Sequence, residues 1–246
     1  PIIIIGESAL ELKSGKYIYE ELKKFLIKNN SINENWNGLN ILVQNASTVG
    51  LLDLKILQDK KEKSSSFFDD LKKRKFKLLY LLGSDNLEFQ KNDEFIVYQG
   101  SHGDRGAEIA DLILPSATYT EQNGLYENLE GRIQECKKAS YPIGEALEDW
   151  KIFNKIIKKL GSKDYKVNFD ELRKEVLETV PNFSEINFLP KKSLIKTNNI
   201  ETSFFSEKIF VRELDYYYTN SISRSSKTMS ECRQIRQKIK KDGTNN

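Results

Sequence analysis

Cysteine, histidine and methionine are scarce in this chain of 246 residues, which has two cysteines, one histidine and one methionine. Cys136 and Cys232 lie far apart, and neither belongs to a Cys-x-x-Cys motif. This spacing argues against a zinc ion or iron–sulfur cluster held by cysteines of this chain alone. It also argues against the disulfide framework of a small exported protein, so we expect a reducing compartment.

Long apolar runs and an excess of one charge are missing as well. The longest apolar stretches, such as Ile2–Ile5 and Leu78–Leu82, fall far short of the roughly 20 residues that span a bilayer. The first residues show no secretory signal pattern. Charged residues make up 30% of the chain but the net charge is only +3. We therefore expect no membrane span, and a surface of mixed sign argues against a dedicated nucleic-acid-binding protein.

What the chain does contain is enough for a folded core, because 38% of its residues are hydrophobic and 11% are aromatic. We expect one compact α/β domain over residues 1–161 and a less compact C-terminal arm with short helices over residues 162–246. The chain begins with Pro1, which is compatible with a trimmed, processed or split polypeptide.

Short apolar runs alternate with amphipathic segments in the first half of the chain. This order predicts a parallel, Rossmann-like sheet with flanking helices. The predicted strands are Pro1–Ile5, Leu39–Val43, Lys77–Leu82, Glu94–Gln99 and Leu112–Leu114, the first and last of them buried. The predicted helices are Lys16–Lys28, with Ser14 as N-cap, and Ala146–Leu160, closed by Gly161. Thr48–Leu57 is a loop or a short helix.

The charged and irregular segments have plainer predictions. Lys60–Ser66 reads as a flexible insertion, and the basic run Lys72–Lys77 as a solvated face, with a binding patch as the alternative. Further on, Phe169–Val180 is predicted to be a helix that Pro181 ends. Asn182–Asp215 is expected to be an extended arm, and Arg233–Lys241 a frayed basic helix. An RNA- or anion-binding function resting on the two basic runs stays open as a third possibility.

Glycines and polar residues follow two of the predicted strands. Parallel sheets bind ligands at the carboxyl ends of their strands, and the candidates there are Gly83, Ser84, Asp85, Gly100, Ser101 and His102. The spacing of Gly100, Gly103 and Gly106 matches neither the dinucleotide fingerprint nor the Walker pattern. Tight turns therefore explain these glycines better than phosphate binding. His102 lies near Asp104, but without a nucleophile motif it is better explained as a turn residue than as a general base.

Three carboxylates share the following segment with an arginine. Glu121, Glu127 and Glu130 could coordinate a cation or transfer protons, but a loop held by a pair between Arg132 and a carboxylate is favoured.

Longer motifs in the same region resemble the molybdopterin oxidoreductase superfamily. The residues that carry this resemblance are Ala110–Pro115, Glu121–Gly124, Asn128–Arg132, Gln134 and the pair Asp149-Trp150. More narrowly, Tyr98–Asp104 with Gly106-Ala107 and Ile109–Pro115 is similar to the large iron–sulfur subunit family of respiratory complex I, the NADH:ubiquinone oxidoreductase. Ser8–Leu10, Ala46–Gly50 and Tyr216–Cys232 are also similar to that family.

The resemblance implies a molybdopterin oxidoreductase-like fold and a structural, non-catalytic role. The family's cysteine-rich part, which holds the iron–sulfur clusters, has no counterpart here. The implied function is a subunit, or half of a split subunit, in the peripheral arm of mitochondrial complex I, on the matrix side of the inner membrane. Its partners would be other peripheral-arm subunits and a companion chain with the clusters. This chain would have no catalytic residue, metal or cofactor, and the six pocket candidates would be vestigial.

The alternative is a fragment of a catalytic molybdopterin-dependent oxidoreductase, such as a formate dehydrogenase. In that case the turns at Gly83 and Gly100 would contact the pterin nucleotide.

Overall fold

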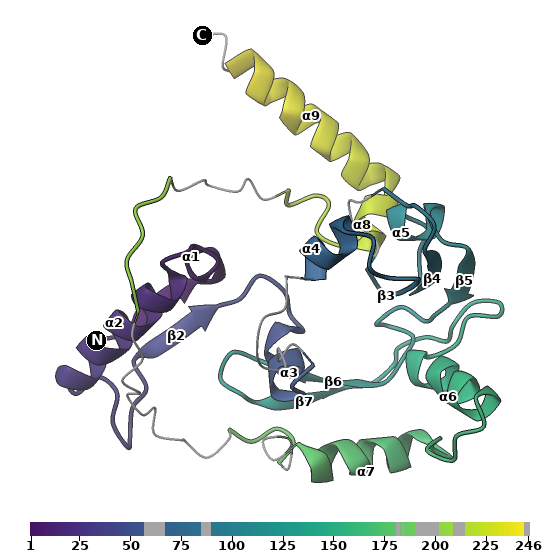
Figure 1. The fold of residues 1–246 in the computed structure, drawn as a ribbon, viewed down its shortest axis with the longest axis horizontal. Coiled ribbons are helices and arrows are strands. Elements are labelled where there is room, and N and C mark those ends of the chain that lie inside the picture. The colour runs from purple at the N-terminus through teal and green to yellow at the C-terminus, as the bar shows by residue number, and fades with distance from the viewer. Residues whose placement is uncertain are drawn as a thin grey trace. The chain divides into compact units, whose positions relative to one another are not determined.

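Parallel strands flanked by helices form a mixed α/β fold in the computed structural model of the chain (Figure 1). The structure describes residues 1–56, 67–84, 90–180, 183, 185–189, 202–208 and 215–243. The chain divides into two compact units. The first comprises Pro1–Lys60, Asn123–Lys137 and Lys166–Phe210, and the second comprises Lys61–Gln122, Lys138–Tyr165 and Val211–Asn246.

The first unit begins with a two-stranded parallel sheet and its covering helix. Its elements are β1 (Ile3–Gly6), α1 (Glu7–Leu10), α2 (Gly15–Lys28) and β2 (Leu39–Leu42), and Ile3 pairs with Leu39. α2 lies alongside β2 (Figure 1). Apolar side chains at helical spacing place Leu26 of α2, which is 0% exposed, against Ile5 and Leu39.

Two predictions about this region are wrong in detail. Within the part of the chain that the structure describes, the first strand is covered on one face, and Ile2 and Ile4 are more than half exposed instead of buried. Ser14 does occupy the N-cap position of α2, but its hydroxyl makes no capping bond. The hydroxyl donates to the carbonyl oxygen of Phe205 at 2.9 Å and accepts from the Phe205 amide at 2.8 Å. Its partner is therefore a distant segment that local sequence does not reveal.

The remainder of the first unit contains a hairpin in place of the predicted pinned loop. Its elements are α3 (Thr48–Asp53), the antiparallel strands β6 (Gly124–Glu127) and β7 (Ile133–Cys136), and α7 (Phe169–Thr179). Asn128 turns the hairpin, because its side-chain oxygen accepts from the amides of Glu130 and Arg132 at 2.9 and 3.0 Å. Ile133 packs with Val180 and Phe183 in a small core.

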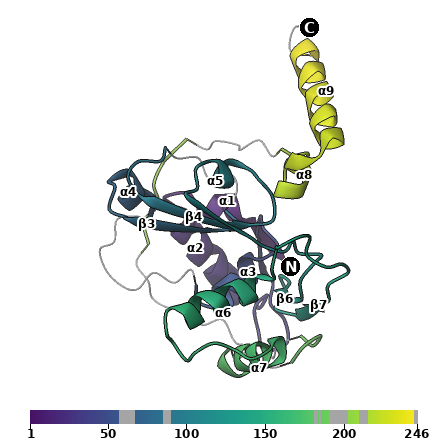
Figure 2. The ribbon, with the colours of Figure 1, turned by 90° about the vertical axis from the view of Figure 1, so that its right-hand side faces the viewer.

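The second unit contains a three-stranded parallel sheet in the order β3-β4-β5 (Figure 1). Figure 2 shows β3 and β4 side by side. Its elements are α4 (Phe67–Lys72), β3 (Leu78–Leu82), β4 (Phe95–Gly100), α5 (Arg105–Glu108), β5 (Leu112–Pro115), α6 (Asp149–Lys159), α8 (Ser221–Ser225) and α9 (Lys227–Gly243). The core of this unit consists of Leu79, Leu81, Ile96 and Tyr98. β4 is central, which places its carboxyl end between two neighbours.

β5 is not the buried strand that its apolar sequence predicts. Among the described residues it pairs only with β4, and Leu112 and Ile113 are 45% and 50% exposed. The helix predicted from Ala146 begins at Asp149, because Leu147 forms a bridge with Ser116 and accepts a hydrogen bond from Ala117. A β-bridge of two residues leaves no periodic pattern in the sequence.

The remaining predictions have mixed outcomes. α7 confirms the helix at residues 169–180, and α9 begins at Lys227, earlier than the predicted Arg233. Lys60–Ser66, Pro181 and most of the arm predicted at Asn182–Asp215 lie outside the described residues. The domain boundary after residue 161 stays a prediction. Within the described parts of the chain, no helix is both long enough and apolar enough to cross a membrane.

Adjacent residues of α2 allow a matched test of this core. Leu26 is 0% exposed whereas Phe25 is 54% exposed. We expect Leu26→Ala to lower the free energy of unfolding by about 2–5 kcal/mol, because it removes buried apolar surface and leaves a cavity. Phe25→Ala should change it by less than about 1 kcal/mol. Urea unfolding followed by circular dichroism measures both, and equal effects would contradict the packing described here.

Candidate functional site

The turn after β4 is shaped around one buried side chain, Tyr98. This tyrosine is 2% exposed, and its hydroxyl donates to the backbone oxygen of His102 at 2.9 Å. A Cβ atom at Gly100 would overlap the tyrosine hydroxyl. At Gly106 a Cβ atom would lie 2.7 Å from the Ser84 carbonyl oxygen and 2.9 Å from the tyrosine ring. These two glycines are therefore required by close packing.

This packing does not fit a phosphate-binding turn. In such turns the glycines leave space in which backbone N–H groups converge on the anion. Here the Tyr98 ring fills the space beside Gly100 and Gly106. A Cβ atom at Gly83 or Gly103 would meet nothing within 4 Å, and Gly83 adopts a φ of +60°. Gly100 and Gly106 therefore do not form a binding turn for the phosphate of a pterin nucleotide.

The other predicted pocket residues have local contacts. The His102 ring lies 2.9 Å, through Nδ1, from the Ser101 hydroxyl. In the described part of the chain no carboxylate pairs with this ring. Ser84 contributes its carbonyl oxygen to the close approach at Gly106. Asp85 lies outside the described residues. The structure thus brings Ser84, Gly100 and His102 together around Tyr98, a residue that sequence reasoning did not single out.

A distant segment also binds to this turn. Asp104 caps α5 by accepting from the Arg105 amide at 2.9 Å, and its other carboxylate oxygen accepts from Nε of Arg224 in α8. The side chains of Asp104 and Arg224 are only 22% and 16% exposed. Asn220 begins α8 with a capping box, in which its side chain accepts from the Ser223 amide at 2.9 Å. The segment at residues 216–232 therefore holds Arg224 against the turn.

A second buried network joins the sheet to α6. Asp149 accepts from the side-chain amides of Gln99 and Gln122 at 2.6 and 3.1 Å. Gln99 is 0% exposed, and its amide oxygen accepts from the Tyr80 hydroxyl. Burial and the nearby Asp149 charge raise the pKa of Tyr80. The signal that could have revealed this network is a glutamine at the end of an apolar strand, where a buried amide needs partners.

Glu148 holds its charge at the start of α6. It is 4% exposed and accepts hydrogen bonds from Trp150 and Lys151, each at 3.0 Å, and from Lys138 at 3.3 Å. Burial by itself raises the pKa of Glu148, but these donors outweigh burial and lower it. Glu148 is thus an ionised structural group.

The carboxylates predicted near Arg132 have different partners in the described residues. Glu121, in the second unit, accepts from the Thr118 amide at 3.1 Å. The distance between Arg132 Nε and Glu130 is 4.0 Å, and the shorter contact of Arg132 is with the Asn187 carbonyl oxygen at 3.1 Å. The predicted pair between Arg132 and a carboxylate is therefore present, with Glu130 as the partner, but it is long, and a backbone carbonyl group is the nearer partner.

Glu127, at the end of β6, is buried beside another carboxyl group. It is 6% exposed, and its Oε2 atom has no hydrogen-bond partner among the described residues. Burial, followed by the charge and hydrogen bond of Asp53, raises the pKa of Glu127 to about 7. Near neutral pH this residue can hold or release a proton.

The fold is that of an α/β protein built on parallel strands. At the edge of the sheet where such folds bind ligands, the protein's own side chains fill the space. The chain belongs to the molybdopterin oxidoreductase family, because the model described as "Molybdopterin oxidoreductase" matches residues 1–159. A second model, which describes the C-terminal part of the G-type subunit of NADH-ubiquinone oxidoreductase, matches residues 185–232. The resemblance found in the sequence is thereby confirmed.

Similar proteins carry names from respiratory NADH dehydrogenases. The "NADH-ubiquinone oxidoreductase 75 kDa subunit" of Reclinomonas americana is 39% identical over 96% of this chain and 34% of its own length. The G-type subunit of NADH-quinone oxidoreductase from Rickettsia bellii is 37% identical over 99% and 34%. The mitochondrial "NADH-ubiquinone oxidoreductase 78 kDa subunit" of Candida albicans is 37% identical over 94% and 32%. This chain thus spans about a third of the length of these relatives.

The glycine turn offers a matched pair of substitutions. We expect Gly106→Ala to lower the free energy of unfolding by about 1–3 kcal/mol, because the new methyl group would meet the Ser84 backbone and the Tyr98 ring. Gly103→Ala, where a Cβ atom would meet nothing within 4 Å, is the control and should be close to neutral. Chemical denaturation of both variants measures the difference, and a tolerated Gly106→Ala would refute the close packing.

The buried carboxyl group predicts an inverse dependence of stability on pH. Because the folded-state pKa of about 7 exceeds the usual 4.5, the folded chain retains a proton that the unfolded chain releases between these values. This contribution to stability is complete below about 4.5 and is lost as the pH rises through 7. Glu127→Gln should remove this loss and stabilise the chain by about 1–2 kcal/mol above neutral pH.

The measurement is the urea midpoint as a function of pH for the wild type, Glu127→Gln and Glu130→Gln. The last variant changes an exposed carboxyl group on the same hairpin and should follow the wild type. A Glu127→Gln profile parallel to that of the wild type would show that Glu127 is ionised in the folded chain.

Proposed function

We propose that this chain is a structural, non-catalytic part of the peripheral arm of respiratory complex I. The observation that carries the proposal is the order of the two family matches, with molybdopterin oxidoreductase over residues 1–159 and the C-terminal model of the G-type subunit over residues 185–232. The relatives named above span nearly the whole chain and carry NADH dehydrogenase names. None of these matches favours the formate dehydrogenase alternative.

The non-catalytic part of the proposal is supported by the turn around Tyr98. This side chain fills the space beside Gly100 and Gly106, where a bound phosphate would need room. The pair of Asp104 and Arg224 holds α8 against the same turn. A turn packed in this way supports neighbouring elements, and the space that a substrate or phosphate would need beside Gly100 and Gly106 is filled.

The first proposed partner is a companion polypeptide that carries the iron–sulfur clusters of the assembly. Such clusters are held by several cysteines, and this sequence has only two. The remaining partners would be other subunits of the peripheral arm. The proposed location is the matrix side of the mitochondrial inner membrane, and the Candida albicans relative is named as mitochondrial.

Blue-native electrophoresis tests the proposal. The respiratory complexes of the source cells are separated in the first dimension, and one band is identified by staining for NADH dehydrogenase activity. A denaturing second dimension should release this chain from that band. Recovery only as a free protein near its own mass of 28.5 kDa would contradict the proposal. Molybdenum or tungsten in stoichiometric amount in that band would contradict its non-catalytic part.

A further inference from the structure

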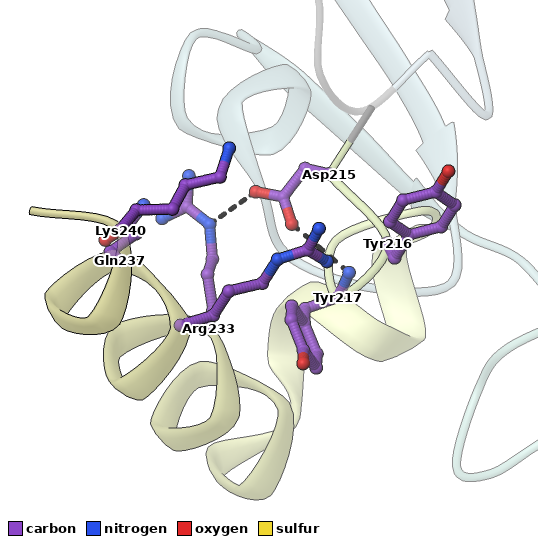
Figure 3. A pocket seen from close by; sticks show the side chains of 7 residues that line it. Asp215, Tyr216, Tyr217, Arg233, Gln237 and Lys240 are labelled. Carbon is purple, nitrogen blue, oxygen red and sulfur yellow. Dashed lines mark hydrogen bonds and ion pairs between the residues drawn. The ribbon is translucent and has the colours of Figure 1, made fainter. Parts of the chain in front are cut away.

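Helix α9 has two different faces, and the first is occupied by the chain itself. Arg233 of α9 forms an ion pair with Asp215 before α8, and its guanidinium group lies 4.5 Å from the centre of the Tyr218 ring. Figure 3 shows Asp215 and Tyr217 facing Arg233 and Gln237 across a cavity of about 300 Å³. Contacts within the chain therefore hold this face of the helix.

The other face of α9 carries exposed apolar side chains. Ile235 and Ile239 are 58% and 65% exposed, and they lie one helical turn apart. Cys232, which is partly buried, comes three positions before Ile235. Residues three and four apart are neighbours on a helix surface, so these three side chains form one narrow row, the apolar seam. The cavity on the first face is lined by other residues of the helix.

The spacing of the apolar seam is typical of helices that pack on one another. A step of three residues and then one of four repeats the a and d positions of a heptad, where the side chains of one helix insert between those of its partner. A helix that lies on a lipid surface needs a broader apolar face than such a row. The seam therefore fits a second helix better than a membrane.

Positive charges flank the apolar seam. Arg236 and Lys238 lie beside the isoleucines, each three positions from one of them, and are therefore their neighbours on the helix surface. Among the described residues neither forms an ion pair with a carboxylate. Glu231, the acidic residue on the same stretch of the helix, is paired with Lys227 at 3.9 Å. A partner of the seam thus meets a positive flank.

The charge of this flank selects the kind of helix that can bind. A second copy of α9 would bring its own Arg236 and Lys238, and like charges beside a helix–helix contact destabilise it. A helix with acidic residues beside its apolar positions would balance both charges. The seam is therefore complementary to an acidic amphipathic helix.

We propose that the apolar seam of α9 is a docking site for an amphipathic helix of a partner protein, in which acidic residues flank the apolar ones. Ile235 and Ile239 pack between the apolar side chains of this helix, and Lys238 and Arg236 pair with its carboxylates. The proposal stands without the proposed function, because it concerns the chemistry of α9 alone.

The test uses the purified chain and a fluorescent synthetic peptide of about three heptads, with leucine at the a and d positions and glutamate at e and g. Titration with the chain should raise the anisotropy of this peptide saturably. A second peptide with lysine at e and g should bind about tenfold more weakly, since like charges would then face Arg236 and Lys238. No binding of the acidic peptide, or equal binding of both peptides, would overturn the proposal.

Substitutions in α9 show whether the peptide binds to the seam. Ile235→Ala and Ile239→Ala should each weaken binding by about tenfold or more, because buried apolar surface is lost. Lys238→Gln should weaken it several-fold. The matched control is Gln234→Ala, an exposed residue of α9 outside the seam, which should bind the peptide as the wild type does. Alanine and glutamine both favour helix, so far-UV circular dichroism should show all variants equally helical. An equal loss in the control, or no loss in the isoleucine variants, would overturn the proposal.

Two further measurements distinguish the other possible occupants of the seam. In sedimentation velocity under reducing conditions the chain alone should be a monomer, and a dimer that Ile239→Ala dissociates would overturn the proposal in favour of a second copy. Vesicles of phosphatidylcholine and phosphatidylserine should sediment no more of the wild type than of Ile239→Ala. Vesicle binding that this substitution abolishes would overturn the proposal in favour of a lipid surface.

Discussion

The packing of Tyr98 across Gly100 and Gly106 is the contact on which the second unit depends. The phenol ring occupies the space into which side chains at positions 100 and 106 would extend. Its hydroxyl donates a hydrogen bond to the backbone oxygen of His102 in the following turn. A single buried aromatic group thus joins the end of the central strand, the turn and α5. Because a tightly packed interior tolerates little change of volume, the identity of these residues is constrained together. Their role is to stabilise the edge of the sheet at which related folds bind ligands.

How far the sequence predicts the structure varies with the range of the interactions. α2, α7 and the parallel strands follow from apolar periodicity and glycine punctuation, which are local signals. The hairpin of β6 and β7 does not, because its strands are short and polar and its turn depends on the side chain of Asn128. Tyr98 illustrates the limit for the candidate site. An aromatic residue within an apolar strand predicts burial, but only the structure shows which glycines it contacts.

The strands are less buried than their apolar sequences predict. Strands that are apolar at nearly every position are typical of parallel sheets covered on both faces. In the first unit, α2 covers one face of β1 and β2, and Ile4 and Leu42 on the other face are 61% and 55% exposed. The apolar sequence of these strands is typical of a sheet that is covered on both faces, so the exposed face fits the proposal that the chain is part of a larger assembly.

The arginines of the C-terminal segment have two different environments. Arg224 and Arg233 each reach a carboxylate, Asp104 in the turn and Asp215 before α8, and so fix α8 and the start of α9. Largely buried pairs such as that of Asp104 and Arg224 are costly to break, since removing one partner leaves the other charge uncompensated. Arg236 lies on the same helix, and its guanidinium group lies over the rings of Tyr216 and Tyr217. The first two arginines thus attach the C-terminal helices through ion pairs, whereas Arg236 packs against aromatic rings of the segment that precedes α8.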